Sequence, residues 1–264
     1  GEVTDRGLKE LTRVRNLQWL SIACPKVTGA GMNELAAIQT LQSLSLSRNF
    51  VTDTNLKISG MKNLRGLDIG QTAVTDVGLK EMGGLTNLRW LRLDQNQVTD
   101  GGLKELAGLN KLHWLDLKHT KVTCEGLKEL AGLKNLHYLD LRETPVTDEG
   151  LKALGTIHSL RSLYLGSTKV TDAGLKELAQ LKNLQLLDLG ITQVSDVGMK
   201  ELVGFQKLHS LHLGSTTVTD AGLKELAGLK YLRYLYLGGK VTDAGVKELQ
   251  KALPHCIVNP HNTF

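Results

Sequence analysis

The sequence predicts an α/β solenoid, in which a parallel β-sheet lines a concave side and short helices line a convex side. The first observation behind this fold class is a repeat: a valine followed by Thr, once by Ser, recurs every 24 residues, and twice after 23. A fixed period of this length indicates a stack of repeats before any other fold. The valines are Val3, Val27, Val51, Val74, Val98, Val122, Val146, Val170, Val194, Val218 and Val241.

The second observation is the pattern inside each repeat. Leucines such as Leu115 and Leu117 alternate with variable residues, which predicts a strand with one buried side. A helical stretch such as 103–106 follows in each repeat. Strands in register form one parallel sheet, and the helices are wider than the strand spacing. The stack therefore curves into a horseshoe with its sheet inside.

The repeat resembles the leucine-rich repeat family. Residues 112–120 read LHWLDLKHT and residues 136–144 read LHYLDLRET, which is the pattern L-x-x-L-x-L-x-x-N with Thr in the last position. The following VTDxGLKEL resembles the cysteine-containing and ribonuclease-inhibitor-like subclasses and bacterial proteins built from such repeats. The resemblance covers residues 3 to about 258. It implies the horseshoe fold, and it implies a binding surface rather than a particular partner.

Each part of the repeat has an expected role. The Asn/Thr position, as at Asn96 and Thr120, is expected to bond backbone groups of the turn after the strand. Thr99 and its equivalents offer a capping oxygen ahead of each helix. Gly108, Gly132 and Gly228 are expected to end helices as C-terminal caps. In the repeat that begins at Val51, Asn55 replaces the usual glycine, which suggests a positive φ there.

The two ends of the chain differ. Residues 241–264 look like a capping unit, with a last strand at Cys256-Ile257-Val258 and Pro260 blocking further pairing. The start has no comparable cap, so apolar surface around Leu20 and Ile22 is expected to be uncovered. This edge could support edge-to-edge self-association. We expect a single domain over residues 1–264, made of about ten repeats.

Composition narrows the class of protein. The net charge is +5 and the pI is near 9.0, but much of the charge lies in repeated Lys-Glu pairs, which indicates a solvated helix face. Cys24, Cys124 and Cys256 are too scattered for a disulfide framework, which favours a reducing compartment such as the cytoplasm. No apolar run approaches the roughly 20 residues of a membrane span. Because Gly1 is not an initiator Met, the chain looks like an excised fragment.

Two columns of residues alternate with the core leucines and are predicted to face the concave side. The first column reads Trp19, Ser43, Gly66, Trp90, Trp114, Tyr138, Ser162, Leu186, Ser210 and Tyr234. The second reads Ser21, Ser45, Asp68, Arg92, Asp116, Asp140, Tyr164, Asp188, His212 and Tyr236. All three Trp and four of the five Tyr fall in these columns, which core packing does not explain.

The candidate partner-binding site is an aromatic ladder in these columns. Trp90, Trp114 and Tyr138 are expected on successive strands about 4.8 Å apart. Aromatic residues with Arg among mixed charges are typical of protein-binding hot spots. The simpler interpretation is that the rings only stack and shield the sheet. The charged neighbours are Arg92, Asp94, Asp116, Lys118, His119, Asp140, Arg142 and Glu143, and a second, less compact aromatic cluster is Tyr164, Tyr234 and Tyr236.

Other chemistry is weakly supported. His113 and His137 lack a third metal ligand, and Asp116 with Asp140 would need a pocket to act as an acid/base pair. No phosphate-binding loop, nucleophile elbow or CxxC motif is present, so we expect no cofactor and no catalytic site. Carboxylates outnumber basic residues in the concave columns, which argues against nucleic acid there.

The sequence therefore predicts a non-enzymatic module that binds a protein or peptide on its concave sheet. A carbohydrate-binding protein that uses the same aromatic ladder is an alternative, because stacked rings beside Asp and Arg also suit sugars. A structural or engineered scaffold without a dedicated partner is the third reading.

Overall fold

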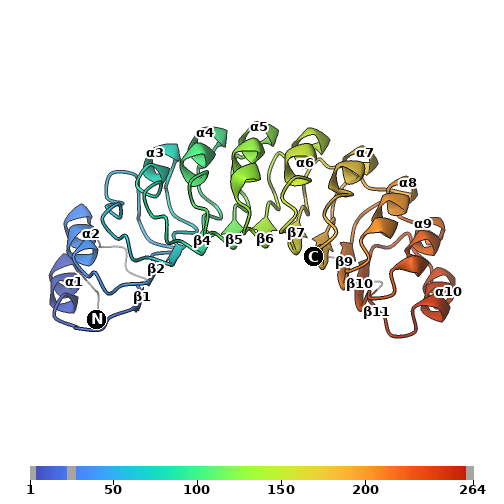
Figure 1. Ribbon diagram of the computed structural model, residues 1–264. Coiled ribbons are helices and arrows are strands. Elements are labelled where there is room, and N and C mark those ends of the chain that lie inside the picture. Colours follow the sequence, from blue (N-terminus) through green and yellow to red (C-terminus); the bar gives the residue numbers. More distant parts are fainter. Residues whose placement is uncertain (1–3, 23–27, 260–264) are drawn as a thin grey trace. The chain divides into compact units, whose positions relative to one another are not determined.

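The computed structural model describes residues 4–22 and 28–259. Cys24 and Pro260 lie outside these residues. The chain forms two compact units, Gly1–Leu136 and His137–Phe264, and each is described by itself. The expectations of one domain and of a horseshoe over the whole chain stay predictions. Within each unit the strands lie along one side and the helices along the other (Figure 1).

The first unit contains a parallel sheet whose described strands follow the order of the chain. Each strand is three residues long and pairs in register with the next, so Gly66 lies beside Trp90 and Trp90 beside Trp114. The strands are β1 (Trp19–Ser21), β2 (Ser43–Ser45), β3 (Gly66–Asp68), β4 (Trp90–Arg92) and β5 (Trp114–Asp116).

The helices of the first unit are short, as predicted, and two of them continue as 3-10 helices. They are α1 (Asp5–Leu11), α2 (Gly29–Ala36), α3 (Asp76–Leu79), α4 (Asp100–Leu103) with η1 (Lys104–Leu106), and α5 (Cys124–Leu127) with η2 (Lys128–Gly132). The repeat over residues 51–64 departs from the prediction, because turns take the place of its helix.

The second unit repeats this arrangement. Its parallel strands, again in chain order, are β6 (Tyr138–Asp140), β7 (Ser162–Tyr164), β8 (Leu186–Asp188), β9 (Ser210–Leu213), β10 (Tyr234–Leu237) and β11 (Ile257–Asn259). Its helices are α6 (Asp148–Leu154), α7 (Asp172–Leu175) with η3 (Lys176–Leu178), α8 (Asp196–Met199) with η4 (Lys200–Gly204), α9 (Asp220–Glu225) with η5 (Leu226–Gly228), and α10 (Asp243–Ala252).

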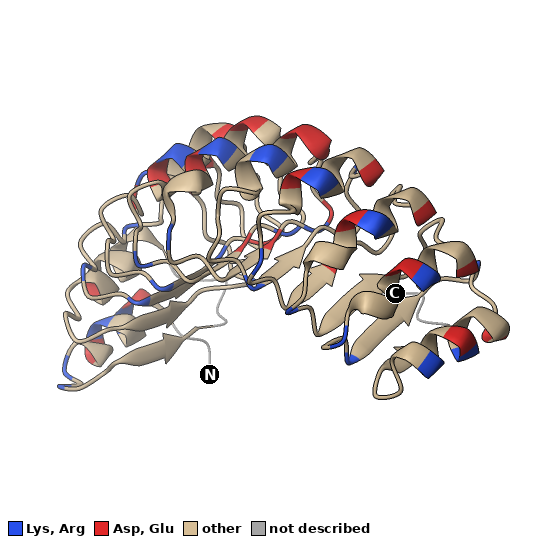
Figure 2. Ribbon diagram, turned by 45° about the vertical axis from the view of Figure 1, so that its right-hand side comes forward, with Lys and Arg blue, Asp and Glu red and all other residues tan. Residues whose placement is uncertain are grey.

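The core consists of the repeated leucines and valines between strands and helices. Leu115, Leu117, Leu139, Leu141 and Val122 are all completely buried, which confirms the predicted face of the strands. Lysines and glutamates alternate along the helices, as the Lys-Glu pairs predict (Figure 2). The outward face of the sheet, on the side away from this core, is called the strand face below.

The helix side is held together by a bond between successive repeats wherever the motif carries its aspartate. The aspartate of one Val-Thr-Asp motif accepts two hydrogen bonds from the Thr or Ser of the following motif. The backbone N–H donates over 2.7 to 2.9 Å and the hydroxyl over 2.5 to 2.7 Å. The pairs are Asp5–Thr28, Asp53–Thr75, Asp76–Thr99, Asp100–Thr123, Asp148–Thr171, Asp172–Ser195, Asp196–Thr219 and Asp220–Thr242. We call each of these an Asp–Thr clamp.

The clamp explains the glycine of the T-D-x-G motif. A Cβ atom at this glycine would lie only 2.1 to 2.6 Å from the carboxylate that arrives from the preceding repeat, so a side chain would displace the clamp. The glycines are Gly31, Gly78, Gly102, Gly126, Gly174, Gly198, Gly222 and Gly245. The predicted capping role of the threonine is confirmed in most repeats, since Thr75 accepts a bond from the N–H of Val77 and most of its equivalents cap their helices in the same way. Thr4 and Thr147 are exceptions, because their side chains make no capping bond.

Asn55 shows what happens where the clamp is missing. The preceding motif has Gly29 in place of aspartate, so no carboxylate reaches Thr52. Instead the Asn55 side chain accepts from the N–H of Thr52 at 2.8 Å and donates to the carbonyl of Phe50. The predicted positive φ at Asn55 is wrong, because this asparagine replaces the missing partner rather than a left-handed glycine.

The left-handed residues lie elsewhere, in the turn that follows each strand. Eight non-glycine residues have φ between 53° and 59°, and each directly precedes the Asn/Thr position. They are Arg48, Gln71, Gln95, His119, Glu143, Ser167, Ile191 and Ser215. The Asn/Thr side chains bond the turn as predicted. Thr120 donates to the Leu117 carbonyl, whereas Asn96 also reaches Ile69 in the preceding repeat.

The predicted glycine caps are wrong. None of the described glycines has a positive φ, and Gly132 and Gly228 are the last residues of η2 and η5. The helices need no left-handed residue because they tighten into 3-10 turns, and the next leucine, such as Leu133, leads on to the strand.

The ends only partly match expectation. Ile22 is buried and its N–H bonds the Ser45 carbonyl, so the expected uncovered surface does not include it. Leu20 is half-buried, and Leu8 of α1 is completely buried. Among the described strands of this unit, β1 pairs only with β2, and self-association through this edge stays a prediction. At the other end, β11 lies one residue later than predicted, and the capping role of residues 241–264 stays a prediction.

The first prediction tests the core. Truncation of Leu115 to Ala should lower the free energy of unfolding by about 2–5 kcal/mol, because it removes buried methyl groups and leaves a cavity. Chemical denaturation followed by circular dichroism measures the change. The exposed Lys104→Ala is the control and should stay within about 0.5 kcal/mol. A loss below about 1 kcal/mol for Leu115→Ala would contradict the assigned core face.

The second prediction tests whether Asn55 compensates for the aspartate that Gly29 replaces. Gly29→Asp alone should destabilise the protein, because the introduced carboxylate meets the Asn55 side chain. Asn55→Gly alone should also destabilise it, because Thr52 and Phe50 lose their partners. The double variant should recover an Asp–Thr clamp. Its loss in free energy of unfolding should be smaller than the sum of the two single losses by about 0.5–3 kcal/mol. Additive losses in denaturation experiments would show that the two positions are not coupled.

Candidate functional site

The strand face of the first unit carries two neighbouring tryptophans. Trp90 on β4 and Trp114 on β5 are paired in register and half-buried. The indole of Trp90 lies over Gly66, since a Cβ there would be 2.0 to 2.2 Å from three of its ring atoms. With Asp68 and Arg92 the two rings line an open depression of about 460 Å³. Because Gly66 has no side chain, the Trp90 ring packs directly over it.

Arg92 is held between carboxylates beside these rings. Its Nε atom forms ion pairs with Asp94 Oδ1 at 2.8 Å and with Asp116 Oδ2 at 3.6 Å. Burial alone would lower the pKa of Arg92, but the charges of Asp94, Asp68 and Asp116 raise it above its ordinary value. The Arg92 side chain is 41% exposed, so it stays accessible to a partner.

The aspartates of the strand face have a structural role that the sequence interpretation missed. The carboxylates of Asp68, Asp116, Asp140 and Asp188 each accept a bond of 2.9 to 3.0 Å from the backbone N–H two residues later. This bond closes the end of the strand as an Asx turn. Asp94, Asp116 and Asp140 are buried, although they were predicted as charged neighbours of the aromatic rings in a partner-binding surface.

The strand face of the second unit holds a separate aromatic group. The rings of Tyr138 and Tyr164 are 5.1 Å apart at a 45° tilt, and the Arg142 guanidinium lies 4.9 Å from the Tyr164 ring centre. Arg142 also binds Asp140 through Nε at 3.0 Å and Nη2 at 2.5 Å. The hydrogen bonds that Arg142 donates to Asp140 raise the pKa of Arg142, and burial raises the pKa of Tyr164. Tyr138, Tyr164 and Arg142 thus form a rigid, cation-bearing patch.

Farther along the same row lie Asp188, His212 and Tyr236 on adjacent strands. The His212 and Tyr236 rings are 4.2 Å apart. Burial lowers the pKa of His212, although the charge of Asp188 acts in the opposite direction. Burial likewise raises the pKa of Asp188, against the effect of its bond from the Gly190 N–H. The sequence predicted that Asp188 and His212 lie in the second outward column, but it did not identify them as site residues.

The remaining predicted site residues lie at the margins. Lys118, His119 and Glu143 lie in the turns after β5 and β6, and the backbone of His119 and Glu143 is left-handed. Tyr234 is 47% exposed and pairs in register with the exposed Ile257. Trp19 is 64% exposed on β1, yet it was not chosen as a candidate. Because Trp19 lies in the same predicted column as Trp90 and Trp114, the sequence pattern could have identified it.

Neither a metal site nor a reactive thiol emerges from the described residues. No group of three His, Cys, Asp or Glu side chains in this part of the chain could hold a metal ion. Cys124 and Cys256 are both buried, and burial raises the pKa of Cys256 to about 11, which keeps its thiol protonated. Over residues 4–22 and 28–259, every helix is too short or too polar to cross a membrane.

Comparisons with known proteins identify the family. Residues 39–98 match the family described as "Leucine rich repeat", and residues 132–155, 156–179 and 206–227 match "Leucine Rich repeat". A crystal structure of an internalin C2 from Listeria monocytogenes is 30% identical, with a TM-score of 0.60 over 80% of this chain and 84% of that one. The chain therefore belongs to the leucine-rich repeat family. No curated protein sequence matches it.

Two more distant structures share the fold. An internalin, inlF, from Listeria monocytogenes is 22% identical, with a TM-score of 0.52 over 99% of this chain and 90% of that one. A plant peptide hormone receptor, RGFR1, solved in complex with RGF2, is 17% identical, with a TM-score of 0.58 over 96% of this chain and 52% of the receptor. The predicted leucine-rich repeat solenoid is thus confirmed.

The third prediction concerns His212. Because burial disfavours its charged form, its pKa should lie below the ordinary value of about 6.5 in an NMR titration. The unfolded chain then takes up this proton more readily, so His212 should make the protein less stable as the pH falls below about 6.5. Asp188→Asn should lower the pKa of His212 further, since it removes a favourable negative charge. Asp243→Asn on α10 is the charge-matched control. A pKa of His212 above 6.5 would contradict the burial argument.

Proposed function

We propose that the protein is a non-enzymatic module that binds a folded protein or a peptide on its strand face. The observation that carries this proposal is the pairing of Trp90 and Trp114 on adjacent strands beside the ion-paired Arg92. Aromatic and arginine side chains supply most of the binding energy in protein interfaces. Here they form an open, shallow surface rather than an enclosed pocket, which suits a macromolecule better than a small substrate.

The geometry of the charges supports the same function. Asp116 beside Arg92 and Asp140 beside Arg142 are themselves tied to the strand ends, so binding costs little ordering of these arginine side chains. In the second unit Tyr138 and Tyr164 offer a further rigid aromatic patch. The leucine-rich repeat structures similar to this chain include a receptor in complex with RGF2, which supports a protein or peptide as the class of partner.

The fourth prediction tests this function. Trp114→Ala should weaken binding of the partner, isolated by pull-down, by about 2 kcal/mol or more, because it removes a central aromatic anchor. Its effect on folding should stay below the roughly 3–5 kcal/mol of a fully buried Trp. Isothermal titration calorimetry and denaturation measure the two effects. Lys104→Ala on the helix side is the matched control and should leave affinity unchanged.

Two outcomes would overturn the assignment. If Trp114→Ala and Lys104→Ala both leave affinity unchanged, the partner binds elsewhere. If Trp114→Ala unfolds the protein, the ring belongs to the core. Binding of neutral glycans on an array, lost in Trp114→Ala, would instead support the carbohydrate-binding alternative.

A further inference from the structure

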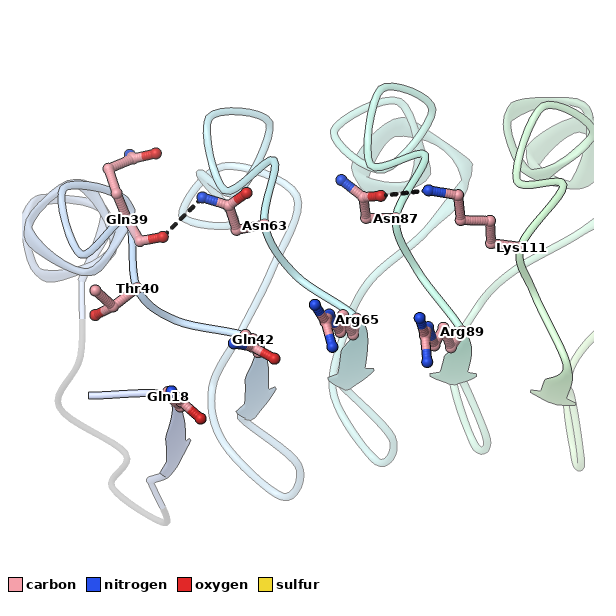
Figure 3. Close-up of a pocket in the computed structure, with 9 residues that line it drawn as sticks. All are labelled: Gln18, Gln39, Thr40, Gln42, Asn63, Arg65, Asn87, Arg89 and Lys111. Carbon is pink, nitrogen blue, oxygen red and sulfur yellow. Dashed lines mark hydrogen bonds between the residues drawn. The ribbon is translucent and has the colours of Figure 1, made fainter. Parts of the chain in front are cut away.

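A second surface lies at the edge of the first unit, where the chain enters its strands. Side chains from the repeats of β1 to β5 line a hollow of about 330 Å³ there (Figure 3). Gln18, Gln42, Arg65 and Arg89 occupy the position directly before their strands, and Lys111 precedes β5. None of these residues belongs to the strand face proposed above.

The charged side chains that line this edge are all basic. No Asp or Glu is among the residues that line the hollow. The segments 39–42, 62–65, 86–89 and 110–113 contain none either, although the chain has 27 acidic residues. On the strand face, by contrast, Arg92 has carboxylate partners. The edge therefore carries a local excess of positive charge that the fold does not neutralise.

Arg65 and Arg89 are the centre of this excess. Because Gly66 pairs with Trp90, the two arginines stand side by side before adjacent strands, whose spacing is about 4.8 Å. Both are exposed, and neither guanidinium makes a hydrogen bond or ion pair with any residue that the structure describes. Like charges facing each other on neighbouring strands are unfavourable. A bound anion would remove this repulsion.

The neighbouring side chains are ordered and polar. Lys111 Nζ donates to Asn87 Oδ1 at 2.8 Å, which leaves two further ammonium donors (Figure 3). Asn63 donates to the Gln39 carbonyl at 2.8 Å. The amide groups of Gln18 and Gln42 lie at the strand end of the same hollow and supply both donors and acceptors (Figure 3). The hollow thus combines cations for anionic groups with amides for hydroxyl groups.

From these observations we propose that this edge binds an anionic polysaccharide. Its sulfate or carboxylate groups bind Arg65, Arg89 and Lys111, and its hydroxyl groups bind the amides of Gln18 and Gln42. A single-stranded nucleic acid fits less well, since its bases need aromatic rings for stacking and the lining has none. An acidic peptide fits less well because the lining is polar throughout and offers no pocket for apolar side chains.

The test uses heparin oligosaccharides as the probe and calorimetry as the measurement. The edge variant Arg65→Ser/Arg89→Ser should bind heparin about tenfold more weakly than the parent, with a shallower dependence on salt because fewer counterions are released. Lys80→Ser/Lys104→Ser removes the same charge from exposed positions on the helix side and should bind within about twofold of the parent. Circular dichroism checks folding, and Arg65→Gln/Arg89→Gln provides a second edge variant should the first unfold.

Several results would overturn the proposal. These are equal loss of heparin binding in the edge and helix variants, equal binding of neutral dextran, or tighter binding of oligothymidylate or polyglutamate than of heparin. Trp114→Ala should keep its heparin affinity, because the ring is not part of the edge. Loss of heparin binding in that variant would place the polysaccharide on the strand face, so the two proposed surfaces succeed or fail separately.

Discussion

The bond between an aspartate of one repeat and the threonine of the next is the interaction on which both units depend. The strands alone are three or four residues long, and most helices hold only four to seven residues, so a single repeat cannot be stable by itself. The Asp100 carboxylate satisfies two donors of Thr123 at once, and the Thr123 hydroxyl caps the next helix. Each clamp therefore sets both the spacing of the repeats and the start of a helix.

The same interaction explains why certain positions do not vary freely. A carboxylate that reaches into the next repeat needs a residue without a Cβ, as at Gly102 and Gly126. Where the carboxylate is lost at Gly29, the glycine is no longer needed, and Asn55 supplies the acceptor from within its own repeat. The polar groups of this region are partnered in both arrangements, as burial of backbone donors requires.

Because the clamps and leucines hold the repeats, the exposed surfaces are free to differ in chemistry. The helices carry both basic and acidic residues (Figure 2). On the strand face, arginines such as Arg92 and Arg142 are tied to carboxylates beside aromatic rings. The edge before the strands of the first unit carries arginines without such partners. The three surfaces thus offer a face of mixed charge, a preorganised aromatic face and a cationic edge.

The sequence by itself determined the repeat, the strand and helix order and the buried face, because leucine spacing records which side of each element leaves water. It also placed the aromatic residues in the outward columns. Only the tertiary structure decided what neighbouring repeats do to one another. The ring of Trp90 over Gly66 and the bonds of the clamp aspartates depend on contacts between residues some 22 to 26 positions apart. The role of Asn55 depends on the residue that the preceding repeat carries at Gly29. A periodic pattern shows that such residues are neighbours, but not which atoms meet, since that depends on side-chain rotamers and on backbone turns such as the left-handed residues before each Asn or Thr.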